Sequence, residues 1–263
     1  MHEIIFVGDI VARPGRVIFS SVISNLRDKF QPVAVIVNGE NASGGFGLDL
    51  RTADELFKAG ADLITTGNHV WKKKDLEIYL EKKADRIIRP ANYPPDSPGK
   101  GYLIFPFGNN LSLGLMNLMG RIFMNDILDC PFRKADELLL GPLKDCTYNI
   151  LDFHAEATSE KLALAHHLDG RVSAIIGTHT HVQTADERIL PKGSAYITDA
   201  GMCGPYDSVI GSEITPTIKK FISGRPHKVS TAKGASCFCG VRLSLDPESR
   251  KAVSISRIFE VIH

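Results

Sequence analysis

Two histidines, His179 and His181, lie two positions apart in the sequence Gly-Thr-His-Thr-His over residues 177–181. They follow the apolar run 172–176, which is typical of a buried strand in a parallel sheet. In an extended chain this spacing places both imidazoles on the same side. Because imidazole nitrogen is a common metal ligand, the pair is a candidate for metal ligation; the alternative is two ordinary loop histidines.

Carboxylate, amide and imidazole side chains also follow four other segments with strand patterns. These segments span residues 3–7, 33–37, 63–66 and 148–153. The polar residues at their ends are Asp9, Glu40, Asn41, Asn68, His69 and His154. In open α/β sheets, ligands bind beyond the carboxyl ends of the strands, so we expect these side chains to form one site.

The residue types indicate a site for two transition-metal ions. Imidazole nitrogen and carboxylate oxygen favour divalent iron, manganese, zinc or cobalt over copper(I). Two divalent ions would carry +4, which Asp9 and Glu40 reduce to +2 and a bridging hydroxide to +1, so the centre would attract a phosphate anion and polarise its P–O bonds. Two ions need a shared ligand, for which the carboxylate of Glu40 is the natural candidate.

Helix and strand patterns alternate along the chain. Helices are predicted over 17–30 and 73–83, in a short segment that opens with a capping box at Thr52, and from a cap at Thr158 to Asp169. Further strands are predicted over 194–198, in a hairpin formed by 102–107 and 111–118, and in a closing hairpin formed by 236–245 and 252–261. The order predicts an α/β protein with mixed sheets covered by helices, in a single domain over residues 1–263.

The composition is that of an ordinary globular protein, with 263 residues, 43% hydrophobic residues and a formal net charge of +1. That charge excludes a strongly basic field for duplex DNA, although it leaves room for a local basic groove. The five cysteines include no CxxC pair, so Cys237 and Cys239 are expected to pack on one face of a strand. The chain opens with a strand and has no apolar run of ~18 residues, which predicts a cytoplasmic protein without a membrane partner.

The motifs together resemble those of the calcineurin-like metallophosphoesterases, and most closely their YmdB-like branch. The similar segments are Gly-Asp-Ile-Val at 8–11, Asn-Gly-Glu-Asn at 38–41, Gly-Asn-His at 67–69, Phe-His-Ala-Glu at 153–156 and Gly-Thr-His-Thr-His at 177–181, with further matches at 117–121 and 198–202. Val11 stands where the wider superfamily usually carries a histidine, and Glu40 where it usually carries an aspartate. Both departures are similar to the YmdB-like pattern.

The resemblance implies a four-layer α/β/β/α sandwich, a di-iron or di-manganese centre and hydrolysis of 2′,3′-cyclic nucleotides to 3′-monophosphates through a hydroxide held by both ions. It implies that Glu40 is shared between the ions. One ion would be held by Asp9, Asn41 and His181, and the other by Asn68, His154 and His179. His69 would protonate the leaving oxygen.

Two other function classes remain open. The same centre could serve a phosphomonoesterase or a protein phosphatase, and a regulatory nucleotide- or RNA-binding protein could carry a vestigial site, although the complete ligand set argues against decay. The expected substrate is a small cyclic nucleotide or an RNA-derived phosphodiester, and a homo-oligomer is possible. Arg121 could meet a phosphate or brace a loop, Asp199 could orient a histidine or cap a turn, and the glycine-rich segment 44–47 could be a flap or an ordinary loop.

Overall fold

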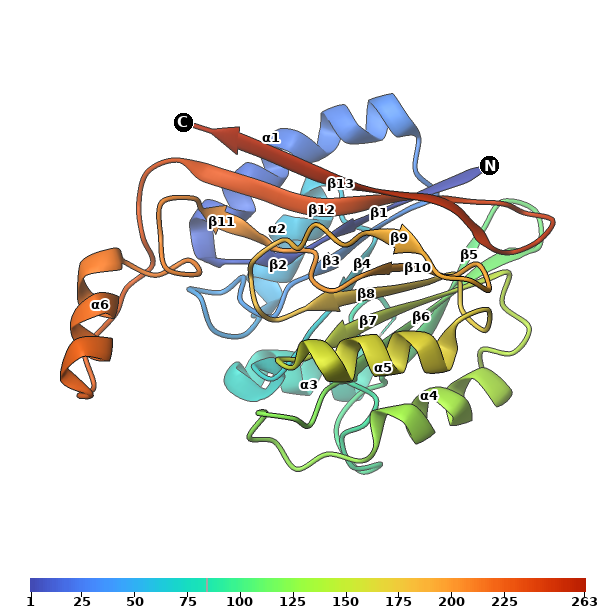
Figure 1. The fold of residues 1–263 in the computed structure, drawn as a ribbon, viewed down its shortest axis with the longest axis horizontal. Helices are drawn as coiled ribbons and strands as arrows, with labels where there is room; N and C mark the ends of the chain where they lie inside the picture. Colours follow the sequence, from blue (N-terminus) through green and yellow to red (C-terminus); the bar gives the residue numbers. More distant parts are fainter. Residues whose placement is uncertain (84) are drawn as a thin grey trace.

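Two mixed β-sheets pack face to face, and helices cover both outer faces (Figure 1). The computed structural model describes residues 1–83 and 85–263. The four layers confirm the predicted α/β/β/α sandwich.

The first sheet combines a parallel N-terminal half with antiparallel strands from the end of the chain. Its strand order is β2-β11-β12-β1-β3-β4, with β13 paired to the outer side of β12. The strands are β1 (His2–Val7), β2 (Asp9–Ile10), β3 (Ala34–Asn38), β4 (Leu63–Thr65), β11 (Met202–Pro205), β12 (Ser236–Leu245) and β13 (Ala252–Ile262). β1, β3 and β4 run parallel, whereas β12 runs antiparallel to both β1 and β13.

The second sheet has the strand order β5-β6-β7-β8-β10-β9. Its strands are β5 (Tyr102–Phe107), β6 (Leu111–Met119), β7 (Tyr148–His154), β8 (Ala174–Thr178), β9 (Arg188–Ile189) and β10 (Ala195–Ile197). β6, β7, β8 and β10 are parallel, and β5 pairs with β6 as the predicted hairpin. The closing hairpin of β12 and β13 is confirmed as well.

Helices cover the sheets in two groups. One outer face carries α1 (Ala12–Phe30), α2 (Leu50–Ala59), the 3-10 turn η1 (Val70–Lys72) and α3 (Lys74–Lys83), and the other carries α4 (Pro131–Leu140) and α5 (Thr158–Leu168). A buried cluster that includes Phe6, Ile36, Ile150 and Ile176 fills the space between the sheets. Helix α6 (Ile214–Ser223) projects from one side of the molecule (Figure 1). None of the helices in the described ranges is long and apolar enough to cross a membrane.

The topology brings the polar strand ends to one edge. The arrowheads of β7 and β8 point toward the side from which α6 projects (Figure 1). The strands of the first sheet end at the same edge. Asp9, which follows β1, and Glu40, which follows β3, lie beside the histidines at the ends of β7 and β8. The expectation that the strand ends meet is therefore confirmed.

Several predicted boundaries are wrong, and the reasons are local. α1 begins five residues before the predicted start, at Ala12. Asp49, rather than Thr52, caps α2, because its carboxylate accepts from the N–H of Thr52. Thr158 is the first residue of α5 and gives no side-chain cap. α4, α6 and β11 had no counterpart among the predicted elements.

Candidate metal centre

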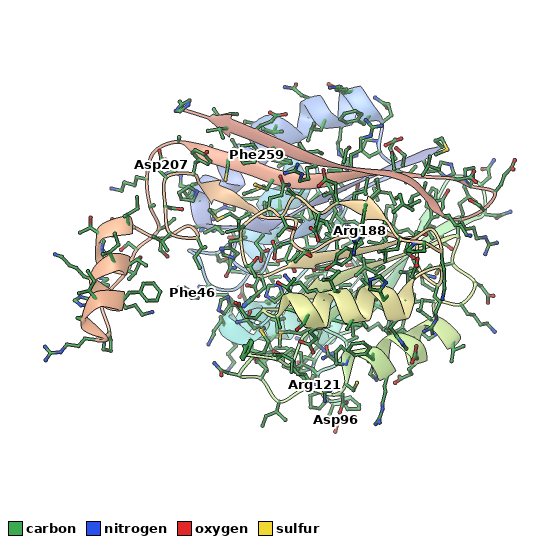
Figure 2. All side chains as sticks on the ribbon, in the orientation of Figure 1. Phe46, Asp96, Arg121, Arg188, Asp207 and Phe259 are labelled. Carbon is green, nitrogen blue, oxygen red and sulfur yellow. The ribbon has the colours of Figure 1, made fainter. Side chains whose placement is uncertain are left out.

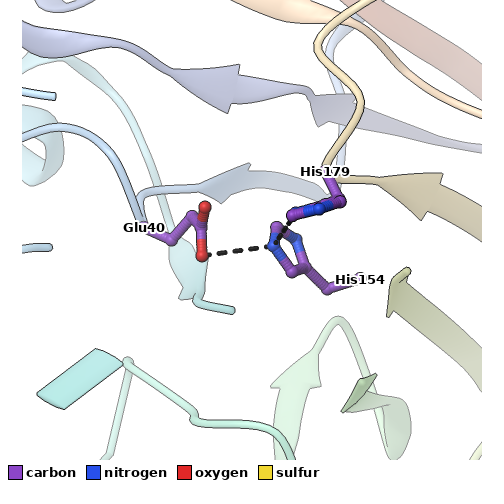
Figure 3. Close-up of side chains that lie close together, drawn as sticks. All are labelled: Glu40, His154 and His179. Atoms are coloured by element: carbon purple, nitrogen blue, oxygen red, sulfur yellow. Dashed lines mark hydrogen bonds and ion pairs between the residues drawn. The ribbon is translucent and has the colours of Figure 1, made fainter. Parts of the chain in front are cut away.

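Glu40 lies at the middle of the polar cluster. It follows β3 and is 1% exposed. The Nε2 atom of His154 lies 3.2 Å from one carboxylate oxygen, and the Nδ1 atom of His69 lies 3.3 Å from the other. Figure 3 shows the Glu40 carboxylate and the ring of His179 converging on His154.

Two groups of potential ligand atoms share the Glu40 carboxylate. The first consists of Glu40, His154 and His179, and the second of Asp9, Glu40 and His181; within each group the ligand atoms all lie within 4.8 Å of one another. The structure thus gathers these five side chains from four separate segments of the sequence. Any ion in one group would be a close neighbour of an ion in the other.

The two asparagines extend these groups. The Oδ1 atom of Asn68 lies 3.0 Å from Nε2 of His154, in the first group. The Nδ2 atom of Asn41 lies 3.1 Å from Nε2 of His181, in the second. Since the amide oxygen and nitrogen are exchanged by a half-turn about the last side-chain bond, Asn41 can present its oxygen to the same point. All seven residues expected as ligands lie together.

Hydrogen bonds fix which ring nitrogen of each histidine is free. Thr178 donates its hydroxyl proton to Asp152 (2.7 Å), so it accepts from Nδ1 of His154 at 2.9 Å, and Nε2 is the nitrogen of His154 that faces Glu40. Nδ1 of His181 donates to the carbonyl oxygen of Ile210 at 3.0 Å, so its Nε2 atom is the one that faces the site, 3.1 Å from Asn41. Such outer contacts are the usual means of orienting metal-binding histidines.

His179 presents its other nitrogen. Its Nε2 atom faces the carboxylate of Glu156 at 3.1 Å, so Nδ1 is the free nitrogen, 3.0 Å from Nε2 of His154. Every histidine of the two groups therefore turns one ring nitrogen toward the other potential ligand atoms and the opposite nitrogen toward an outer partner.

One carboxylate oxygen in the site lacks a partner. Oδ2 of Asp9 accepts from the backbone N–H of His179 at 3.2 Å, but Oδ1 is fully buried and has no hydrogen-bond partner among the described residues. A buried unpaired carboxylate oxygen is costly. A cation between Asp9, Glu40 and His181 would compensate it, and hard oxygen with imidazole nitrogen suits divalent iron or manganese. The residues present therefore fit a metal centre.

The pKa values show how strongly the charges interact. Burial is the main effect at Asp9 and raises its pKa to about 6. At His154 burial lowers the pKa, but the carboxylates of Glu40 and Asp9 outweigh it and raise the pKa to about 9. Burial and the charge of His154 lower the pKa of His179 to about 3. The carboxylates thus hold a positive charge among the histidines, in the place where a cation would otherwise supply it.

The turn that carries His179 and His181 is not extended as predicted. Both residues have positive φ angles, 101° and 66°, in a region that side chains other than glycine rarely adopt. Asp199 holds this turn: its Oδ2 atom accepts from the N–H and the hydroxyl of Thr180 at 3.0 and 2.8 Å. A buried Lys161 in turn binds Asp199 (2.9 Å) and the carbonyl oxygen of Thr178. The strained turn places the two histidines in different groups.

Gly67 leaves room for the centre. A Cβ atom on this residue would lie 2.3 Å from the Glu40 carboxylate and 2.4 Å from Nε2 of His154. The backbone between β4 and Asn68 can therefore approach the ligand groups only because residue 67 has no side chain.

His69 belongs to neither ligand group. Its Nδ1 atom lies 2.7 Å from Oδ1 of Asn41, and its ring packs edge-on against Phe46 with centroids 5.1 Å apart. Both residues line a cavity of about 750 Å³ that also contains Glu40. The glycine-rich segment that carries Phe46 therefore borders the site, and Figure 2 shows Phe46 on the side of α6.

Arg121 does not line that cavity. Its backbone N–H donates to the carboxylate of Glu160 at 3.1 Å, and its side chain is exposed. Figure 2 shows it below α5, in the part of the view near α4. Of the two roles considered, the structure supports the bracing of a loop, made by the main chain.

Comparison with known proteins identifies the family. The family model described as "YmdB-like protein" matches residues 5–258. The chain belongs to the YmdB-like family. It is 47% identical to the 2′,3′-cyclic-nucleotide 2′-phosphodiesterase of Bacillus subtilis over 97% of this chain and 96% of that protein.

Two solved structures agree with this family assignment. A hypothetical protein from Thermus thermophilus is 44% identical and superposes with a TM-score of 0.91 over 98% of this chain and 99% of that one. A structure titled as a novel phosphatase from Mycoplasma pneumoniae is 40% identical, with a TM-score of 0.92 over 99% of this chain and 93% of that one. The YmdB-like fold therefore extends over almost the whole chain.

Sequence reasoning missed the residues that support this YmdB-like site. Asp152 and Thr178 orient His154, Glu156 faces His179, and Lys161 anchors Asp199. Asp152, Glu156 and Thr178 lie within two positions of a predicted ligand, so their proximity in sequence could have suggested a supporting role. Nothing in the sequence suggested such a role for Lys161, because a lysine in a helix is ordinarily exposed.

Proposed function

We propose that this chain hydrolyses 2′,3′-cyclic nucleotides to 3′-monophosphates with the help of two transition-metal ions, iron or manganese. One group would consist of Asp9, Glu40, Asn41 and His181, and the other of Glu40, Asn68, His154 and His179. The observation that carries this proposal is the position of Glu40, whose carboxylate belongs to both groups of ligand atoms. The activity named for the Bacillus subtilis relative supports the choice of substrate.

A phosphoester hydrolase is the broad function that the relatives support, since they are named phosphodiesterase and phosphatase. The ions, when bound, supply positive charge that polarises the phosphodiester and lowers the pKa of the attacking water. The ligand residues Glu40, Asn41, His179 and His181 line a cavity of about 750 Å³, so they would hold the ions where a small substrate can reach them.

His69 is the residue in this cavity that we assign to proton transfer. Asn41 and Glu40 face its Nδ1 atom with acceptor oxygens, so Nε2 is the nitrogen left to give a proton to the leaving oxygen, which it would do from the imidazolium form of the ring. In the net reaction the water oxygen bonds to phosphorus, the bond from phosphorus to O2′ breaks, and a proton ends on O2′. Phe46 packs against the ring and restricts its movement.

A cyclic diester suits the charge of the proposed centre. Two divalent ions, two carboxylates and a hydroxide leave a formal charge near +1, which matches the single negative charge of a phosphodiester. The five-membered ring of a 2′,3′-cyclic phosphate is strained, and ring opening relieves that strain. Cleavage on the 2′ side rests on the name of the Bacillus subtilis relative.

Three substrates test the proposal. The protein is incubated with manganese and 2′,3′-cyclic AMP, 3′,5′-cyclic AMP or nitrophenyl phosphate, and the products are separated by chromatography. We expect fastest turnover of 2′,3′-cyclic AMP, with 3′-AMP as product. Preferred hydrolysis of the monoester would favour a phosphomonoesterase. A 2′-AMP product would show that the bond from phosphorus to O3′ breaks instead of the bond to O2′. Absence of turnover on all three would favour the regulatory binding protein.

A further inference from the structure

Two further cavities continue from the candidate metal centre along helices α1 and α2. The first, of about 690 Å³, shares the rim residues Gly44 and Thr231 with the cavity that contains Glu40. The second, of about 680 Å³, shares Arg13, Arg16 and Arg51 with the first. The three cavities therefore lie in a row that starts at the candidate metal centre, and we call this row the furrow.

Cationic side chains dominate the walls of this furrow. The two cavities beyond the centre are lined by five cationic residues, which are Arg13, Arg16, Arg51, Lys58 and Lys233. They contain only two acidic residues, Asp49 and Glu55, so their net charge is +3 although the whole chain carries +1. Positive charge is thus concentrated on the path that leads away from the centre.

Most of these cations form no ion pair with the residues that the structure describes. Arg16 pairs with Glu55 at 2.7 Å and donates to a backbone carbonyl oxygen. In the described part of the chain no carboxylate lies within 4.0 Å of the other four cationic groups, and all four side chains are exposed. The carboxylate of Asp49 already accepts from the N–H of Thr52. The furrow therefore has free positive charge to offer a ligand.

The spacing of the charges suits a ligand with several phosphates. Arg51 and Lys58 lie seven positions apart on one face of α2, which separates them by about 10 Å along the helix axis. Arg13 lies in the first turn of α1, which the Arg16–Glu55 ion pair joins to α2. A single mononucleotide bound at the metal centre would leave this row of charges unused.

We propose that the furrow binds single-stranded RNA whose 3′ end carries a 2′,3′-cyclic phosphate. This inference rests on the proposed function for the terminal group. In such a molecule the cyclic phosphate is at one end, and every other phosphate lies on its 5′ side. The terminal group would occupy the metal centre, and the preceding phosphates would follow the row formed by Arg13, Arg51, Lys58 and Lys233. Phe46, 61% exposed at the metal cavity, offers a stacking surface for the terminal base.

The first experiment compares 2′,3′-cyclic AMP with a trinucleotide ending in a 2′,3′-cyclic phosphate. We expect KM for the trinucleotide to be at least ~10-fold lower at low salt, and to rise with salt because several phosphates are contacted. The double variant Arg51→Glu/Lys233→Glu should raise that KM by about 10-fold and weaken its salt dependence. It should leave kcat and KM for 2′,3′-cyclic AMP unchanged.

A matched control reverses two charges at the opposite edge of the sheets. Lys144 and Lys192 are exposed and precede β7 and β10, at the amino ends of those parallel strands. Lys144→Glu/Lys192→Glu changes the net charge by the same amount as Arg51→Glu/Lys233→Glu, which we call the furrow variant. We expect its kinetics with both substrates to be those of the unaltered protein. If both double variants raised KM for the trinucleotide equally, net charge alone would explain the effect, and the proposal that the furrow binds RNA would be wrong.

Binding separates failure of the furrow from failure of the proposed function. The probe is a fluorescent trinucleotide with a 3′-phosphate, and its Kd is measured by anisotropy. Weaker binding to the furrow variant alone supports the furrow, even if no cyclic phosphate is hydrolysed and the proposed function falls. An equal Kd for the furrow variant and the unaltered protein would contradict RNA binding in the furrow, even if 2′,3′-cyclic AMP is a good substrate.

Discussion

At the scale of single residues, His69 and the ligand histidines are chemically alike but have different surroundings. His154, His179 and His181 each have a ring nitrogen grouped with the carboxylates of Glu40 or Asp9, whereas His69 contacts Asn41 and Phe46 and lines the cavity. The sequence motif Gly-Asn-His could not make this distinction by itself. The outer hydrogen bonds decide it.

His69→Ala is expected to keep its metal content and lose about 10²–10⁴-fold in kcat, which is the usual contribution of a general acid. The loss should shrink with bis(nitrophenyl) phosphate, because nitrophenolate leaves without a proton. Parallel metal analysis and kinetics on both substrates check this. Loss of bound metal from the variant would instead make His69 a ligand.

Asp199 supports the strained turn between the two histidines, and its charge is balanced by the buried Lys161. Asp199→Asn should lower the free energy of unfolding by about 3 kcal/mol, because it leaves the lysine charge buried without a partner. Metal affinity should fall as well, since the turn loses its anchor. Denaturant unfolding and metal titration measure the two effects.

The double variant Lys161→Met/Asp199→Asn separates those effects. Replacing both charges removes the unpaired lysine, so much of the stability should return. Metal affinity should stay low, because the charged anchor of Thr180 is still absent. If metal affinity recovered together with stability, the ion pair would have a purely structural role.

At the scale of elements, α2 shows where local sequence signals mislead. The capping box predicted at Thr52 is absent, because Asp49 three residues earlier already satisfies the first-turn N–H. The hydroxyl of Thr52 is buried and has no hydrogen-bond partner in the described structure. Both residue types favour helix N-termini, so the sequence alone could not rank them.

Asp49→Ala should destabilise the protein by about 1 kcal/mol, the usual cost of losing an N-cap, whereas Thr52→Val should be near neutral. Burial raises the pKa of Asp49, but hydrogen bonds, chiefly from Thr52, together outweigh it and hold the pKa below its ordinary value. A lowered pKa means that the cap stabilises fully above the unfolded-state pKa of about 3.9 and is lost as the pH falls through the folded value. Thermal unfolding at pH 7 and at acid pH compares the two variants; a larger cost for Thr52→Val would restore the capping box.

Strands were predicted better than the elements of the loops. The strand patterns at 148–153 and 172–176 are typical of burial in a parallel sheet, and β7 and β8 lie there within one or two residues. Helix α6 was missed although Ile214, Ile218, Phe221 and Ile222 recur at helical spacing. In the structure this face is exposed, with Phe221 and Ile222 78% and 82% exposed, so the helix does not pack on a sheet as α1 and α5 do.

At the scale of the whole molecule, the two sheets bring together side chains that are far apart in the chain. Asp9 and His181 are separated by 172 positions in sequence, yet their ligand atoms lie 3.8 Å apart. Their convergence could be predicted, since parallel strands end at a common edge. The positive φ angles of His179 and His181 could not, because contacts with Asp199 and Ile210 from other elements impose that turn.

Metal stoichiometry tests the central claim most directly. The protein is purified without chelator, supplied with manganese or ferrous iron, and separated from excess ion by gel filtration. Its metal content per chain is then measured by inductively coupled plasma mass spectrometry. The shared carboxylate of Glu40 and the unpaired oxygen of Asp9 predict two ions per chain in the unaltered protein and a clear loss in Glu40→Gln, which keeps the shape of the side chain and removes its charge. One ion or none in the unaltered protein, or two ions retained in Glu40→Gln, would contradict a two-metal centre built on Glu40.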